Sequence, residues 1–106
     1  MLAETDLESK AEEVAQLMGV LSNPRRLLIL CKLAESREMN VSALVEAVGL
    51  SQSALSQHLA LMRAMGLVAT RKEGLNVHYR IADARVFEMM RALEAIFCPQ
   101  GKPKKR

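Results

Sequence analysis

The spacing of apolar side chains predicts helices over much of the chain. From Leu7 onwards, apolar residues recur every three or four positions, which indicates an amphipathic helix as far as about Gly19. Asn23 and Pro24 suit the N-cap and first turn of a second helix that runs to about Ala34. This second helix is apolar on most sides, so we expect it to be the central buried helix.

Two shorter helices follow, with a turn between them. Residues 36–39 are mostly polar and form either a loop or a brief strand. Asn40 suits the N-cap of a helix over residues 41–48, and a glycine follows that helix. Ser51 suits the N-cap of the next helix, over residues 52–65. Two helices joined by a short turn that contains glycine are typical of a helix-turn-helix.

The rest of the chain predicts a hairpin and a last helix. Residues 67–72 and 77–82 are expected to form two strands joined by a turn that contains glycine. Asp83 begins a final helix with an apolar stripe, and Pro99 ends it. We therefore predict a mainly α fold with a small β-hairpin, a winged helix-turn-helix, as one domain over residues 1–98.

The first and last helices carry more apolar surface than one chain covers. Both are longer than the winged-helix motif requires, and both have an apolar stripe. A chain of 106 residues buries only a thin core. We therefore expect a symmetric homodimer with these two helices at the interface. The alternative is that the two helices pack on each other within one subunit.

Charge is distributed unevenly along the chain. The net charge is +3, yet the first 20 residues hold five acids and one base, whereas residues 61–80 hold four bases and one acid. Residues 99–106 add four more bases, and we expect them to form a disordered basic tail. A basic segment beside a neutral body suggests a polyanionic partner such as nucleic acid. A solvated face with a solubilising tail fits the same charges.

Several classes of protein are disfavoured by the sequence. No stretch is apolar over the roughly 18 residues that a membrane span needs, and the acidic start does not resemble a secretion signal. We therefore expect a cytoplasmic protein whose two cysteines are free thiols. There is no Cys-x-x-Cys, Gly-rich phosphate loop or recognisable Ser-His-Asp arrangement, so we expect neither an enzyme nor a cofactor. An interaction module that does not bind DNA is a further alternative.

The helix over residues 52–65 has a surface suited to the major groove of DNA. At 100° per residue, Leu55, Leu59 and Met62 fall on an inward face, and the outward face is small, polar and free of acids. The candidate contacts are Gln52, Ser53, Ser56 and Gln57. His58 lies at the border of the inward face, where a structural hydrogen bond is as plausible as a DNA contact. An ordinary polar surface helix is the competing interpretation.

The hairpin supplies positive charge beside that helix. Strand alternation places Val77, Tyr79 and Ile81 on one face, with polar side chains on the other. Basic side chains here suit phosphates, or the minor groove at the tip of the hairpin. The candidate contacts are Arg71, Lys72, Asn76, His78 and Arg80. The expected partner is double-stranded operator DNA with an inverted repeat, because a symmetric dimer presents two reading helices.

The string LSQSALSQHL at residues 50–59 resembles the ArsR/SmtB family of dimeric bacterial repressors. The strings LSNPRR at residues 21–26 and GLV at residues 66–68 support this resemblance, which covers roughly residues 10–98. It implies a winged-helix dimer that leaves its operator when an inducer binds.

Many members of that family sense metals, and this sequence departs from two of their patterns. One pattern places a Cys-x-Cys motif around the third helix, but residues 41–48 contain no Cys, His or Asp. The other places Asp and His pairs on the last helix, which has no His here. We therefore assign no metal ligands, and a metal or a general oxidant is the alternative effector.

Cys31 in the second helix and Cys98 at the end of the last helix resemble the thiol pair of the BigR/SqrR-type persulfide sensors in this family. The resemblance implies that reactive sulfur species, persulfide or polysulfide, crosslink the two thiols and release the protein from DNA. A bridge that contains extra sulfur spans more than the roughly 7 Å between Cα atoms that a disulfide tolerates. Taken alone, Cys31 is mid-helix in apolar company, which raises a thiol pKa and equally suits a small buried hydrophobe. Cys98 beside Pro99 equally suits an incidental surface thiol.

Overall fold

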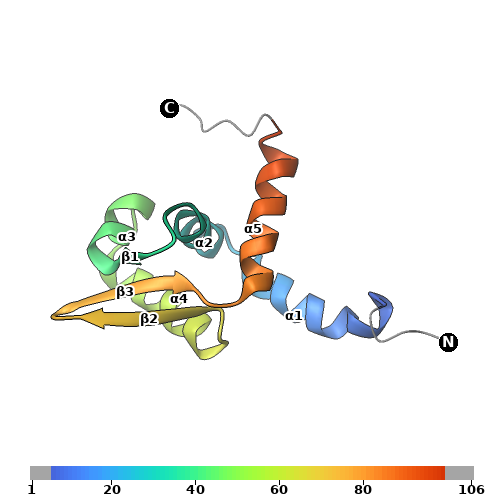
Figure 1. Cartoon of the computed structure of the whole chain (residues 1–106), viewed down its shortest axis with the longest axis horizontal. Helices are drawn as coiled ribbons and strands as arrows, with labels where there is room; N and C mark the ends of the chain where they lie inside the picture. Colours follow the sequence, from blue (N-terminus) through green and yellow to red (C-terminus); the bar gives the residue numbers. More distant parts are fainter. Residues whose placement is uncertain (1–5, 100–106) are drawn as a thin grey trace.

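A computed structural model describes residues 6–99, and its elements follow the predicted order (Figure 1). The helices are a short 3-10 turn η1 (Glu8–Lys10), then α1 (Ala11–Leu21), α2 (Pro24–Ser36), α3 (Val41–Val48), α4 (Gln52–Ala64) and α5 (Ala84–Phe97). The strands are β1 (Met39–Asn40), β2 (Val68–Glu73) and β3 (Asn76–Ile81). The mainly helical winged helix-turn-helix is confirmed. The tail that the sequence predicts to be disordered falls on residues 99–106, of which 100–106 lie outside the described residues.

The helix starts are set by side chains that the sequence analysis identified. Asn23, Asn40, Ser51 and Asp83 each accept a hydrogen bond from a backbone N–H two or three positions further on, at 2.8 to 3.1 Å. These contacts satisfy donors that have no partner within the helix. The caps therefore fix where α2, α3, α4 and α5 begin.

Two helices end later than predicted. α1 continues past Gly19 because its last residue, Leu21, is buried in the core, and packing outweighs the weak helix preference of glycine. α2 runs beyond the predicted end to Ser36. Arg37 then closes α2 with a φ of 73°, which is uncommon for a residue with a Cβ atom.

The core lies where α2, α3 and α4 meet α5 and the sheet. The most deeply buried side chains are Ile29, Leu30, Leu33, Leu44, Leu55, Leu59, Met62 and Val86. Among residues 6–99, no polar or charged residue is buried. The interior is therefore aliphatic, in keeping with a chain in which aromatic residues make up 3%.

The wing is a three-stranded antiparallel sheet in the order β1-β3-β2. A two-residue turn joins β2 to β3, and Gly74 adopts the φ of 62° that this turn requires. β1 is the brief strand that the sequence left as one of two possibilities. It pairs Met39 with Tyr79 and Asn40 with His78. The connection between α2 and α3 is therefore part of the wing sheet.

α1 and α5 leave the core in different directions (Figure 1). Arg85 in the first turn of α5 forms an ion pair with Glu13 in the first turn of α1. Met18 of α1 is 54% exposed, and Ile96 and Phe97 near the end of α5 are 66% and 76% exposed. Within one chain, the two helices thus leave part of their apolar stripes uncovered. No helix in the described part of the chain is both long and apolar enough to cross a membrane.

Candidate functional site

Over its first two turns, the outward face of α4 is polar and uncharged, as predicted. Leu55, Leu59 and Met62 are at most 1% exposed and anchor the helix to the core. The exposed side chains near its start are Gln52, Ser53, Ser56 and Gln57. The Ser51 hydroxyl that caps the helix lies 3.4 Å from the Ser53 hydroxyl. This face can therefore approach a base edge without an acid to repel the phosphates.

His58 lies between the two faces of α4 and is half-buried. Burial lowers the pKa of His58, and the positive charges of Arg26 and Arg25 at the start of α2 lower it further. The imidazole is therefore neutral at physiological pH. It adds no positive charge to the candidate DNA surface.

A groove between α4 and the wing contains residues that the sequence analysis left out. It is lined by Ser56, Ala60, Arg63, Ala64 and Tyr79. Arg63 is exposed there and adds a positive charge. The sequence could have indicated Arg63 through its spacing, because Ser56, Ala60 and Arg63 follow one another at four and three positions along a single helix face.

The register of the hairpin sorts the predicted wing residues onto two faces, because paired residues in a sheet share a face. Lys72 pairs with Val77, on the face of Tyr79, which lines the groove beside α4. The other face holds Arg71, Asn76, His78 and Arg80. Only Lys72 of this predicted set is therefore on the α4 side of the wing.

Arg71 is held by two acidic side chains. Its guanidinium donates two hydrogen bonds to the Glu38 carboxylate, at 3.1 and 2.8 Å, and lies 3.4 Å from Glu73. The hydrogen bonds from Arg71 hold the pKa of the Glu38 carboxyl below its usual range. His78 lies 3.4 Å from the same Glu73 and its side chain is 19% exposed. These two acids compete with a DNA phosphate for the Arg71 guanidinium.

Both cysteines are free and exposed. The interpretation of Cys31 as a buried hydrophobe is therefore wrong. α2 turns Ile29, Leu30 and Leu33 towards the core, whereas Cys31 lies on the side that faces α5. Cys98 is the C-cap of α5 and donates its backbone N–H to the Glu94 carbonyl at 2.7 Å.

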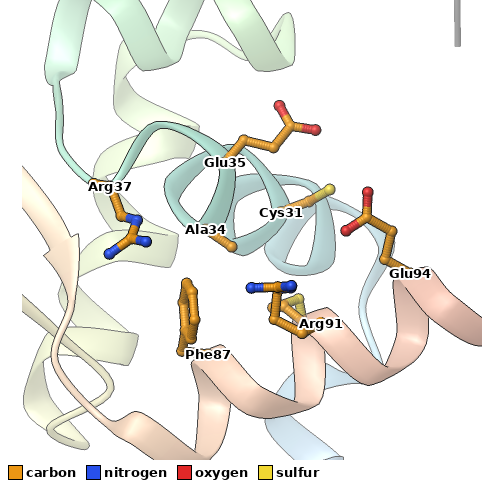
Figure 2. Close-up of a pocket in the computed structure, with 8 residues that line it drawn as sticks. Cys31, Ala34, Glu35, Arg37, Phe87, Arg91 and Glu94 are labelled. Carbon is orange, nitrogen blue, oxygen red and sulfur yellow. The ribbon is translucent and has the colours of Figure 1, made fainter. Parts of the chain in front are cut away.

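The Cys31 thiol opens into a pocket between α2 and α5 (Figure 2). The pocket is lined by Cys31, Ala34, Glu35, Arg37, Phe87, Met90, Arg91 and Glu94. The Phe87 ring contacts two guanidinium groups, with Arg37 Cζ at 5.3 Å and Arg91 Cζ at 5.9 Å from its centroid. The sulfur of Cys31 points towards Glu94 (Figure 2).

Cys98 borders an adjoining pocket on the same helix. Arg91 and Glu94 line both this pocket and the pocket of Cys31. Partial burial of the thiol in its pocket raises the pKa of Cys31, and the charge of Glu35 raises it further; Lys32 opposes this, and Glu94 and Cys98 add smaller increases. The two thiols therefore lie around one pair of charged residues, and Cys31 is mostly protonated at neutral pH.

No group of three or more His, Cys, Asp and Glu side chains within residues 6–99 is arranged to hold a metal ion.

Comparison with known proteins points to one family. The family model described as "Bacterial regulatory protein, arsR family" matches residues 23–70, from the N-cap of α2 into β2. The chain is similar to the biofilm growth-associated repressor of Xylella fastidiosa (strain Temecula1), with 40% identity over 97 residues that cover 92% of this chain and 84% of that protein. The crystal structure of the transcriptional repressor BigR from Xylella fastidiosa aligns with a TM-score of 0.83 and 38% identity, over 92% of this chain and 98% of that one.

A second relative is HlyU of Vibrio cholerae, which is described as a transcriptional activator. It is 41% identical over 93 residues, which cover 88% of this chain and 85% of that protein. The structure of reduced HlyU aligns with a TM-score of 0.80 and 40% identity, over 91% of this chain and 99% of that one.

Proposed function

This chain belongs to the ArsR family of bacterial regulatory proteins, whose members are DNA-binding transcriptional regulators and not enzymes, and we propose that it is a repressor controlled by reactive sulfur. It binds operator DNA in the cytoplasm as a homodimer and leaves the operator when persulfide or polysulfide links Cys31 to Cys98. The observation that carries the choice of effector is the position of both exposed thiols around Arg91 and Glu94.

The outward face of α4 supplies the contacts to base edges in this proposal. Gln52, Ser53, Ser56 and Gln57 combine donors and acceptors with little bulk. Arg63 lines the groove between α4 and the wing, and Lys72 lies on the same face of the wing as Tyr79, so both suit phosphates. Two copies of this surface read an inverted repeat whose half-sites are about 34 Å apart.

The dimer is supported by the apolar side chains that one chain leaves exposed on α1 and α5. Met18, Ile96 and Phe97 are more than half exposed. A second copy that covers them would bury the excess apolar surface by two-fold symmetry. This arrangement fixes the distance between the two α4 helices.

Crosslinking proceeds by thiol exchange and needs no oxidant other than the persulfide. A cysteine thiolate attacks the outer sulfur of a persulfide RS–SH, the S–S bond breaks, and the thiol RSH leaves. A second transfer lengthens the chain by one sulfur, and the other cysteine then closes the bridge with loss of hydrogen sulfide. Two cysteines and two persulfides thus give one trisulfide, two RSH and one molecule of hydrogen sulfide.

The bridge ties the middle of α2 to the end of α5. α5 contributes to the proposed dimer interface, and α2 contributes Ile29 and Leu30 to the core that supports α4. The bridge therefore changes the angle between the two α4 helices of the dimer. A small change in that angle removes several phosphate contacts at once, and these contacts supply much of the affinity for DNA.

A titration tests the choice of effector. An operator is first selected from random duplexes, and its binding is then measured with glutathione persulfide, hydrogen peroxide or zinc. We expect the persulfide to release wild-type protein, and the Cys31→Ser, Cys98→Ser and double variants to stay bound. Mass spectrometry of released protein should show an intramolecular link with added sulfur. Release by stoichiometric zinc, with a double variant that still responds, would refute the sulfur proposal in favour of a metal.

A further inference from the structure

Four charged side chains line the pocket of the Cys31 thiol without forming ion pairs with one another. Glu35, Arg37, Arg91 and Glu94 all line its pocket (Figure 2). In the described part of the chain, neither Arg37 nor Arg91 pairs with a carboxylate, and their guanidinium groups contact only the ring of Phe87.

Two other arginines of this chain do pair with acids. Arg71 binds Glu38 and Glu73, and Arg85 binds Asp83 and Glu13, whereas Arg37 and Arg91 share their pocket with two acids and pair with neither. The pocket is therefore a place where two positive and two negative groups are left available to a ligand. Their charges cancel, so a ligand that satisfies all of them carries both signs itself.

These charges specify the chemistry of a matching ligand. A guanidinium binds a carboxylate through parallel hydrogen bonds, and a glutamate binds an ammonium group. Hydrogen sulfide and inorganic polysulfides carry neither an ammonium nor a carboxylate. Amino-acid and small-peptide thiols carry both, and the side chain of Phe87 offers an apolar surface for their methylene groups.

We propose that this pocket binds the persulfides of amino-acid or small-peptide thiols and presents their outer sulfur to Cys31. The inference rests on the proposed function and names the carrier that delivers the sulfur. Arg37 and Arg91 hold the carboxylate of the carrier, and Glu35 and Glu94 hold its ammonium group. The Cys31 thiolate then attacks the outer sulfur, the S–S bond of the carrier breaks, and the carrier leaves as a thiol after it takes up a proton. Cys31 becomes a persulfide, with no net oxidation.

The test compares carriers of different charge, and each rate is divided by the rate of the same carrier with a free small-molecule thiol, because the carriers also differ in the pKa of the leaving thiol. Cysteine persulfide, its methyl ester and the persulfide of uncharged 2-mercaptoethanol react with the Cys98→Ser protein, and quenched mass spectrometry gives the rate of Cys31 persulfidation. We expect cysteine persulfide to react at least about tenfold faster than the uncharged carrier, as one well-formed charge-assisted contact allows. The methyl ester should lose most of that advantage.

Arginine variants identify the residues responsible. Arg91→Gln and Arg37→Gln should each slow the reaction with cysteine persulfide and leave the methyl ester and the uncharged carrier unaffected. Arg25→Gln, at an exposed arginine on the start of α2, is the matched control. For each variant, the ratio of the reaction rates with two carriers is compared, because a change in the thiolate fraction of Cys31 alters both rates equally and cancels in the ratio. Each variant must bind the operator when reduced, and Arg91→Gln suffices if Arg37→Gln fails to fold.

The outcomes separate this inference from the proposed function. Equal rates for all carriers, with normal release from DNA, would overturn the pocket inference and leave the sulfur-controlled repressor intact. An arginine variant that slows every carrier equally would also overturn it. A wild-type protein that no carrier modifies would refute the proposed function, and the pocket inference with it.

Discussion

Replacement of Glu38 by glutamine is the sharpest test of the wing. Glu38 accepts both hydrogen bonds that hold the Arg71 guanidinium, at 3.1 and 2.8 Å. Glutamine has nearly the same shape as glutamate but no charge, so this substitution weakens the interaction with Arg71 and keeps a side chain of the same size. We expect Arg71 to become free to exchange its remaining contact with Glu73 for a DNA phosphate.

The size of the effect follows from counterion release. One additional neutralised phosphate steepens the slope of log K against log salt by about 0.9. Between 50 and 200 mM salt, the Glu38→Gln variant should therefore lose about 3.5 times more affinity than the wild type loses. At low salt, the variant should bind its operator more tightly.

The assay is operator binding by fluorescence anisotropy at four or more salt concentrations. Glu88→Gln removes the same charge from an exposed position on α5 and is the control for a general charge effect. An unchanged slope for Glu38→Gln, combined with a shallower slope for Arg71→Gln, would show that Arg71 already contacts DNA in the wild type. That result would refute the view that Glu38 restrains it.

Three other substitutions have defined outcomes. Leu55→Ala removes a fully buried side chain and should destabilise the protein by about 2–5 kcal/mol in chemical denaturation, whereas Leu61→Ala, at an exposed position of the same helix, should cost far less. Glu35→Gln removes a charge that raises the pKa of Cys31, so alkylation of Cys31 at pH 7 should be faster in this variant, and a slower rate would contradict the assigned cause. Arg63→Gln should make the salt slope of operator binding shallower by about 0.9, and an unchanged slope would exclude Arg63 from the DNA surface.

The parts of the fold that depend on local chemistry were predictable. The two faces of α4 follow from helical periodicity, and the starts of α2 to α5 follow from single capping side chains. The exposure of Cys31 was not predictable from its apolar neighbours. Leu30 and Leu33 point into the core, whereas the thiol lies on the side of α2 that faces α5, and this depends on how two distant helices pack.

The restraint on Arg71 was likewise invisible in the sequence. Glu38 lies 33 positions before Arg71, and the two meet because β1 joins the sheet beside β3. A two-residue strand has too few residues to show alternation. The sequence therefore identified the basic residues of the wing but not which of them is already occupied by an acid.

The pairing of β1 with β3 has a mechanical consequence. Arg37 contacts the Phe87 ring in the thiol pocket, and Glu38, the next residue, holds Arg71 in the wing. One peptide bond separates these two contacts, and Met39 continues directly into the sheet. The wing is thus connected to the end of α2 through β1 as well as to α4 through β2, so we expect a displacement of that end to reach the hairpin without passing through α4.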